Sequence, residues 1–337
     1  MRTEKSLSGC PSSGGQPLSV YQAHFLMHQI LGGSAPTMEV CSQPQNSIFT
    51  HKIMKHSILL LFSICLFGHM ANGQHAASKK PATPKPFVLG LIDQIPSREL
   101  GETRALNIYL PDGYSPDSPD RYPVIYLLDG SADEDFIHVA GIVQFRTMIA
   151  AMPKSIIVGI ANVDRKRDFT FPTTIDSDKR AYPTTGGSAA FMRFVEKELQ
   201  PFIRKNYRTS TSSTLIGQSL GGLFATEVLL KKPELFDNYI IVSPSLWWDG
   251  ESLLKAAPAL WARQSDPDLQ VYISVGTEGA RMEDDAKQLS AILGASGKKH
   301  LRMNFVPLRE ENHLTILHNS VYRALMLLHP GKAVQSE

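Results

Sequence analysis

The sequence predicts an α/β protein in which helices cover both faces of a mainly parallel central sheet. Short, entirely apolar runs recur along the chain, and strands that are buried on both faces have this composition. Segments of helical length separate these runs, and such alternation is typical of a parallel sheet. The apolar runs are residues 124–128, 155–160, 214–216, 239–242, 271–275 and 303–306.

The first 73 residues differ from the rest of the chain. A basic start at Met54 is followed by a ten-residue apolar run, 58–67, and by small residues up to Gly73. This order is typical of a secretory signal peptide, and its apolar run is too short to span a bilayer. We therefore expect residues 1–53 to be an extension upstream of the true start and residues 54–73 to be a cleaved signal peptide of a secreted or periplasmic protein. The alternative is a buried apolar segment of a genuine long N-terminal region.

The expected cleavage also bounds the chemistry of the mature chain. All three cysteines, Cys10, Cys41 and Cys65, precede it, so neither a disulfide nor a cysteine-bound metal is expected. The chain has no H-E-x-x-H pattern, and we expect no metal or other cofactor. The removed segment carries four of the 34 Lys and Arg and two of the 32 Asp and Glu, which leaves 30 of each sign. A neutral mature protein has no nucleic-acid-binding signature and, on this interpretation, no membrane span.

Residues 74–86 contain three prolines and are typical of an extended linker. One domain is expected from residue 87 to residue 330, with a tail at 331–337. Residues 87–95 and 104–110 have strand composition, so we expect an antiparallel pair at the edge of the sheet. Later in the chain, apolar residues recur at helical spacing in three segments, 189–205, 286–293 and 314–328.

The segment 213–222 carries the strongest functional pattern. A short strand leads into Gly217-Gln-Ser-Leu-Gly221, which matches G-x-S-x-G, and an apolar helix face follows at 223–230. A serine at the tip of a strand, turn and helix is held in a strained backbone conformation, and the glycines remove Cβ atoms that would collide. We predict that Ser219 is a catalytic nucleophile with an exposed hydroxyl. The alternative is an ordinary serine in a glycine-rich turn.

The second element of the predicted site is an oxyanion hole. In an open parallel sheet, functional groups gather at the carboxyl ends of the strands. Asp129-Gly130-Ser131 follow the run 124–128. The backbone N–H groups of Ser131 and Leu220 would together stabilise the charge that develops in a tetrahedral intermediate. The alternative is a plain Asp-Gly turn.

The third element is the acid of a catalytic triad. Glu278 follows the run 271–275 directly, and a carboxylate there can hold an imidazole in the correct tautomer and stabilise its cation. Asp249, after the preceding strand, is the rival candidate. Three further acidic residues resemble the first turn of a helix, where they favour the helix dipole; they are Glu283, Asp284 and Asp285.

The base is expected to be a histidine after the last strand. Of the four histidines that follow Ser219, His300 precedes that strand, while His318 and His329 belong to the closing helix. His313 lies in the loop directly after the strand and is the predicted base. The chain order Ser219, Glu278, His313 is the nucleophile, acid, base order of α/β-hydrolases.

Two further groups are candidates for substrate binding. Arg165 and Arg167 would pair with an anionic or polyhydroxylated substrate, and Trp247 and Trp248 would stack on a sugar or aromatic ring. The alternatives are a structural cluster of Arg167 with Asp168, and a tryptophan pair that closes the edge of the core.

From about residue 87 to 329 the chain resembles the putative-esterase family of α/β-hydrolases, which includes enterochelin, feruloyl and acetylxylan esterases and mycolyltransferases. Five motifs match in order: residues 104–114, Tyr126-Leu-Leu-Asp-Gly130, Gly217-Gln-Ser-Leu-Gly-Gly222, Ser243-Pro-Ser-Leu-Trp-Trp248 and Asn312-His313. The resemblance implies a serine esterase with a Ser-His-acid triad and assigns the second oxyanion N–H to Ser131. Residues 165–172 depart from the family pattern Arg-x-Arg-Asp-x-Thr-Pro, because Phe171 is inserted before the proline.

We therefore expect an exported serine carboxylic-ester hydrolase that works through an acyl-serine intermediate on a small-molecule or polysaccharide-linked ester. Two alternatives remain open. One is an acyltransferase that uses the same triad, and the other is an inactive hydrolase fold that binds a glycan or siderophore. The sequence does not indicate which ester is used or the oligomeric state.

Overall fold

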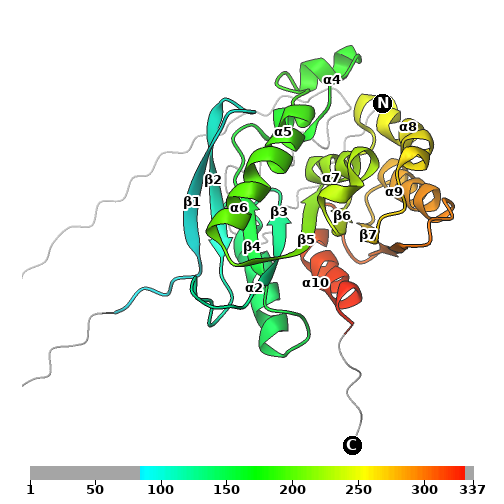
Figure 1. The fold of residues 1–337 in the computed structure, drawn as a ribbon. Helices are drawn as coiled ribbons and strands as arrows, with labels where there is room; N and C mark the ends of the chain where they lie inside the picture. The colour runs from blue at the N-terminus through cyan, green and yellow to red at the C-terminus, as the bar shows by residue number, and fades with distance from the viewer. Residues whose placement is uncertain (1–83, 331–337) are drawn as a thin grey trace, which may run out of the picture. The chain divides into compact units, whose positions relative to one another are not determined.

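The computed structural model describes residues 84–330, which contain an eight-stranded sheet in the order β1-β2-β4-β3-β5-β6-β7-β8 (Figure 1). The expected upstream extension, signal peptide, linker start and C-terminal tail lie outside the described residues. The strands are β1 (Leu91–Ser97), β2 (Glu102–Tyr109), β3 (Tyr122–Leu127), β4 (Ile156–Ile160), β5 (Thr209–Gln218), β6 (Asn238–Val242), β7 (Leu269–Val275) and β8 (Leu301–Pro307).

The sheet is parallel from β4 to β8 and antiparallel at its β1 edge, as the sequence predicts. β1 pairs with β2, and β2 pairs with β4, both antiparallel, whereas the pairs from β4 through β3, β5, β6 and β7 to β8 are all parallel. Gly101 turns the chain between β1 and β2 with φ of 68°, a value that glycine adopts without strain. Because parallel strands end on one side, the segments that follow β3, β5, β6, β7 and β8 meet at the same edge.

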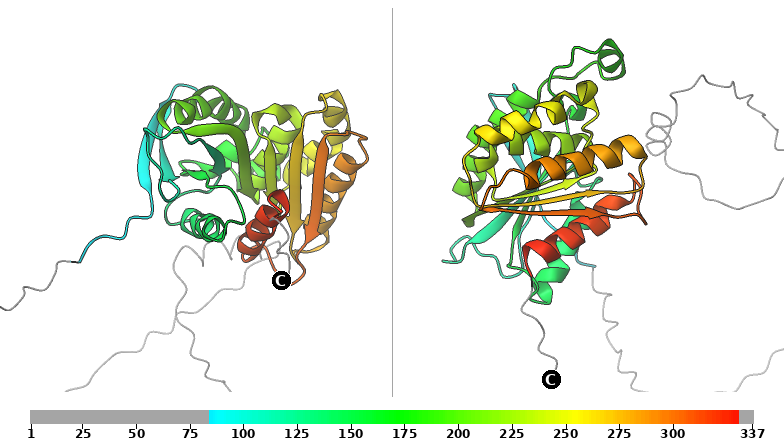
Figure 2. Two further views of the ribbon diagram at one scale, coloured as in Figure 1. Left: turned by 60° about the horizontal axis from the view of Figure 1, so that its bottom comes forward. Right: turned by 90° about the vertical axis from the view of Figure 1, so that its right-hand side faces the viewer.

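Helices cover both faces of the sheet, which confirms the predicted layering (Figure 2). α2 and α10 lie on one face, and α5 to α9 lie on the other. The helices are α2 (Phe136–Met148), α3 (Arg165–Phe169), α4 (Asp176–Ala181), α5 (Ser188–Phe194), α6 (Gln200–Asn206), α7 (Leu220–Lys231), α8 (Trp248–Arg263), α9 (Ala280–Gly294) and α10 (Ile316–Leu328), with short turns η1 (Val195–Leu199) and η2 (Pro233–Leu235). Within residues 84–330, none of these helices has the length and apolar character needed to cross a bilayer.

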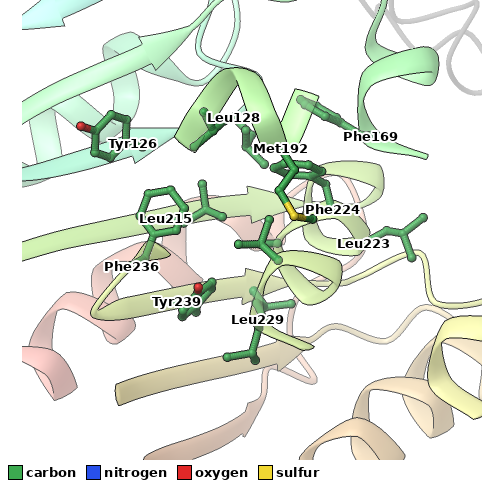
Figure 3. Packing of buried hydrophobic residues seen from close by; sticks show 14 of the residues in the cluster. Tyr126, Leu128, Phe169, Met192, Leu215, Leu223, Phe224, Leu229, Phe236 and Tyr239 are labelled. Atoms are coloured by element: carbon green, nitrogen blue, oxygen red, sulfur yellow. The ribbon is translucent and has the colours of Figure 1, made fainter. Parts of the chain in front are cut away.

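The two cores follow from the alternation of side chains along each central strand. In β5, Leu215 packs into the core under α7, and its neighbour Ile216 packs into the core under α10. β6 alternates in the same way, with Tyr239 on one face and Ile240 on the other. Figure 3 shows the larger core, where side chains of α7 such as Phe224 pack against the strands. This double burial explains why the strands are recognisable as apolar runs.

The helices differ from the sequence prediction in two ways. The expected helix at 189–205 is present, but the π turn η1 interrupts it between α5 and α6. α2, α3, α4 and α8 were not predicted. The sequence does not indicate where α8 starts, because Asp249, Gly250 and Glu251, directly after Trp248, have positive φ angles rather than helical ones. These four residues form an irregular entry that no helical spacing marks.

Candidate active site

Ser219 stands at the sharp turn between β5 and α7. Its φ and ψ angles are 59° and −120°, a strained combination for a residue with a side chain, and it is half-buried rather than fully exposed. The turn requires glycine at position 217, because a Cβ atom there would lie 2.4 Å from the carbonyl oxygen of Gly221. The Ser219 N–H donates to the Val242 carbonyl oxygen at 3.1 Å, which fixes the turn against β6.

Glu278 and His313 come together at the carboxyl edge of the sheet. Glu278 follows β7 and His313 follows β8, two neighbouring parallel strands. His313 Nδ1 lies 2.5 Å from Glu278 Oε2. The Glu278 side chain is 2% exposed and the His313 side chain 13% exposed, so the pair is shielded from water while the ring keeps an accessible edge.

Neutral donors hold the second carboxylate oxygen of Glu278. The Ser243 hydroxyl donates to Oε1 at 2.5 Å, and the Gly276 N–H donates to the same atom at 2.9 Å. Burial by itself raises the pKa of the Glu278 carboxyl, but the hydrogen bonds from His313, Ser243 and Gly276 outweigh it and leave the pKa below its usual range. Glu278 is therefore ionised at neutral pH.

The turn that carries Ser219 is tied to the loop that carries His313. The Gln218 side-chain amide donates to the His313 carbonyl oxygen at 2.6 Å. The Ser219 hydroxyl itself lies 3.3 Å from the Ser245 hydroxyl, and among the described residues it makes no hydrogen bond to the His313 ring.

The rival acids occupy other positions. Asp249 accepts hydrogen bonds from the Thr173 hydroxyl at 2.7 Å and the Thr174 N–H at 3.1 Å, and so belongs to the entry of α8. Glu283 lies in the first turn of α9, where its carboxylate accepts the N–H groups of Glu278 and Gly279. Glu283 thus supports the loop of Glu278 without reaching His313.

The other histidines lie elsewhere. His300 directly precedes β8, at the amino end of that strand. His318 is on α10, and its ring centroid is 3.7 Å from that of His138 on α2. His329 is the residue after α10. Among these four, His313 is the histidine that pairs with the acid after β7.

The two predicted oxyanion donors follow β3 and β5, two neighbouring parallel strands. Leu220 is the first residue of α7, so its N–H belongs to the first turn, where helices leave their amide donors without intrahelical acceptors. The Ser131 N–H donates to Glu134 Oε2 at 3.2 Å, and Glu134 is an exposed residue. An oxyanion at Ser131 would therefore have to displace the Glu134 side chain.

Asp135, in the turn after β3, has an unusual pKa. Burial, and then the negative charges of Asp129 and Glu134, raise the pKa of Asp135 to about 7. Arg165 lowers it only in part. The sequence gives no indication of this, because Asp135 acquires its surroundings from the fold of the turn after β3.

Arg165 and Arg167 make structural ion pairs. Arg165 binds both oxygens of Asp129 at 2.6 and 2.9 Å and donates to the Gln218 carbonyl oxygen at 3.3 Å. Arg167 binds Glu102 through both terminal nitrogens and Asp168 through Nε. This is the structural cluster that the sequence left open for Arg167. Arg165 connects the turn of Ser131 with the turn of Ser219, so its substrate role stays a prediction.

The two tryptophans differ in exposure. Trp248 is 0% exposed, and its indole N–H donates to the Phe171 carbonyl oxygen at 2.9 Å. It therefore offers no face to a ligand, and the core-closing role that the sequence left open applies to it. Trp247 is half-buried, with its ring 6.0 Å from that of Tyr182. Only Trp247 remains available to stack on a substrate.

Sequence reasoning missed the roles of Ser243, Ser245 and Glu134. The first two lie in the motif Ser243-Pro-Ser-Leu-Trp-Trp248, which was recognised without a function for its serines. Their position directly after a buried strand was the available signal, because that is where functional groups of a parallel sheet gather. Glu134 had no such signal.

The site and fold together define a serine hydrolase of the α/β class, and comparisons with known proteins agree. A family model described as putative esterase matches residues 97–313. Ferri-bacillibactin esterase BesA of Bacillus subtilis (strain 168) is 33% identical over 252 residues, which cover 68% of this chain and 86% of that protein. The siderophore triacetylfusarinine C esterase of Aspergillus fumigatus is 28% identical over 244 residues, or 61% of this chain and 80% of that protein.

Solved structures show the same relationship. An IroE-like serine hydrolase from Shewanella oneidensis has a TM-score of 0.66 and 31% identity, covering 72% of this chain and 80% of that one. The BES protein from Bacillus cereus has a TM-score of 0.65 and 29% identity, covering 74% and 98%. The chain belongs to the putative-esterase family, and it is a serine esterase with the α/β-hydrolase fold.

Proposed function

We propose that the protein hydrolyses carboxylic esters through an acyl-serine intermediate, with Ser219 as nucleophile, His313 as base and Glu278 as acid. The observation that carries this proposal is the 2.5 Å contact between His313 Nδ1 and Glu278 Oε2, beside a strained serine turn. Because Nδ1 faces Glu278, Nε2 is the ring nitrogen free to take the Ser219 proton.

Each step then has a residue to perform it. Ser219 Oγ attacks the ester carbonyl while His313 takes its proton, and the ionised Glu278 stabilises the imidazolium. The N–H groups of Leu220 and Ser131 stabilise the oxyanion, after Glu134 has moved away. His313 returns the proton to the leaving alkoxide, which leaves an acyl-serine. A water molecule then attacks the acyl-serine by the same steps, which frees Ser219 and releases the carboxylic acid product.

We further propose a siderophore ester as the substrate. This rests on the names of the two relatives reported above, a ferri-bacillibactin esterase and a triacetylfusarinine C esterase, each covered over at least 80% of its length. A feruloyl esterase relative is covered over only 26% of its length, so plant-wall esters are the second choice. Export through the signal peptide at 54–73 is proposed on the sequence pattern alone.

The test is turnover of four esters by the purified protein: nitrophenyl acetate, methyl ferulate, acetylated xylan and the trilactone enterobactin, with and without ferric ion. We expect the trilactone to have the highest kcat/KM and Ser219→Ala to abolish turnover and labelling by a fluorophosphonate probe. Equal labelling of wild type and Ser219→Ala would refute the triad. Burst kinetics with added alcohol acceptors separates hydrolysis from acyl transfer.

A further inference from the structure

The acid of the proposed triad has a partner that the triad does not explain. Ser243 is the first residue after β6, and its side chain is completely buried. Its hydroxyl donates to Glu278 Oε1 at 2.5 Å, while Glu278 Oε2 faces His313. Ser243 is thus bonded to the oxygen of the carboxylate that the histidine does not use.

The backbone of Ser243 is strained. Its φ angle is 43°, in the left-handed region that favours glycine, yet the residue carries a side chain. Its N–H donates to the Ser274 carbonyl oxygen at 2.8 Å, which locks it onto β7, the strand that leads to Glu278. A turn that needed only this backbone geometry would be better served by glycine, so the hydroxyl is the feature that serine adds.

The same short segment also reaches the nucleophile. Two residues after Ser243, the Ser245 N–H donates to the Ser219 carbonyl oxygen at 3.0 Å, and the two hydroxyls are 3.3 Å apart. Between them, Pro244 packs against Gly222, where a Cβ atom would lie 3.0 Å from Pro244 Cα. The segment 243–245 therefore joins the acid to the nucleophile across β6, the strand between them.

We propose that Ser243 is a positioning residue that orients the Glu278 carboxylate toward His313. This inference rests on the proposed triad and adds to it a fourth side chain. Two donors, the Ser243 hydroxyl and the Gly276 N–H, fix Oε1 and so prevent the carboxylate from rotating away from the imidazole. Ser243 does not touch the reacting atoms and acts through Glu278.

The test uses two substitutions that remove the same hydroxyl but differ in backbone strain. Ser243→Ala keeps a side chain at positive φ, whereas Ser243→Gly relieves the strain. We expect each to lower kcat by about tenfold, the size of effect for a lost hydrogen bond to a charged group, with KM little changed. Ser243→Gly is expected to have the higher Tm of the two, so activity and stability would separate.

A pH profile gives a readout that a merely structural role would not move. Without the hydroxyl, the Glu278 carboxylate is less well stabilised and the Glu278–His313 pair holds its proton more tightly. The acidic limb of the kcat/KM profile is therefore expected to move to higher pH in both variants. Ser320→Ala is the control, because Ser320 is a buried serine of α10 that bonds Ser274 and Tyr272 rather than Glu278.

Four outcomes decide the matter. The inference is overturned if the loss of folded protein reported by a lower Tm accounts for the whole fall in kcat. It is also overturned if the acidic limb of the kcat/KM profile stays in place in both variants. The role of Ser243 is also rejected if Ser243→Ala turns over ester at the wild-type rate while Ser219→Ala is inactive. In that case the proposed triad still stands. If wild type neither hydrolyses an ester nor reacts with a fluorophosphonate, the triad and the role of Ser243 both fail.

Discussion

Two buried carboxylates, Asp168 and Glu278, are nearly equal in exposure but differ in the charge of their partners. The Asp168 side chain is 1% exposed and bonds two guanidinium groups, those of Arg104 and Arg167. The Glu278 side chain is 2% exposed and bonds the His313 imidazole and neutral donors. Permanent cations balance Asp168 at all times, whereas Glu278 is balanced fully only when the imidazole is protonated.

The difference teaches how burial of an acid relates to its role. A carboxylate that is already neutralised by arginine has no unmet attraction for a further positive charge, and it serves the fold. A carboxylate held by neutral donors stabilises a cation that forms only during turnover, and this is what a triad requires. If the proposed triad is correct, burial alone does not separate a catalytic acid from a structural one, whereas the identity of the partners does.

The largest effect is expected at the nucleophile and the base that Glu278 serves. Ser219→Ala and His313→Ala should each lower kcat on the order of 10³-fold or more, and the double variant should be hardly worse, since the two residues act as one unit. Steady-state kinetics on nitrophenyl acetate measures this, and unchanged Tm values would show that folding survives.

His318→Ala and His300→Ala are the controls, because neither residue contacts Glu278 in the structure. Loss of turnover in His318→Ala with activity retained in His313→Ala would show that the base has been assigned to the wrong histidine.

Glu278→Gln comes next in size. Glutamine preserves the shape of the side chain but cannot stabilise the imidazolium, so kcat should fall about 10²- to 10³-fold with KM nearly unchanged. Asp249→Asn and Asp284→Asn are matched charge deletions outside the pair and should stay close to wild type. If Asp249→Asn lost its activity while Glu278→Gln kept it, the acid of the triad would be Asp249, in the segment after β6.

Asp168→Asn should show the opposite behaviour. It leaves Arg104, which is 1% exposed, with one carboxylate partner fewer, and removing one partner of a buried ion pair costs about 3 kcal/mol or more. Urea denaturation should reveal this loss of unfolding free energy, while kcat of the folded protein stays within about twofold. A large fall in kcat without a change in stability would give Asp168 a catalytic role and break the contrast with Glu278.

The smallest expected effect concerns Asp135, the acid whose pKa is raised to about 7. The folded state holds this proton more tightly than the unfolded state, so the protein loses stability as pH rises from about 4 to 7. Partial exposure screens the effect, and we expect about 2 kcal/mol. In Asp135→Asn this loss should disappear, so the variant should gain stability over wild type with rising pH in denaturation curves at pH 4 and pH 7. A constant difference between the two proteins would contradict the raised pKa.

The turn that carries Ser219 was predictable because its signals are local. The G-x-S-x-G pattern, the strand before it and the helix after it all lie within 18 residues around Ser219, and glycine at 217 is required by an immediate neighbour, Gly221. Glu278 and His313 were located by a general property of parallel sheets, namely that functional groups follow the strands. The alternation of apolar runs likewise predicted the layering, since both faces of each central strand are covered.

What the sequence by itself determined was therefore the fold class and the three positions at the strand ends. The partners were decided by the tertiary structure: Arg165 meets Asp129 across 36 residues, Arg167 meets Glu102 across 65, and Ser243 meets Glu278 across 35. Trp248 is fully buried, with its indole N–H bonded to the Phe171 carbonyl oxygen and its ring against that of Tyr182. The physical reason is that strand order brings together segments far apart in the chain, and an arginine, serine or tryptophan takes its role from whichever neighbour that order supplies.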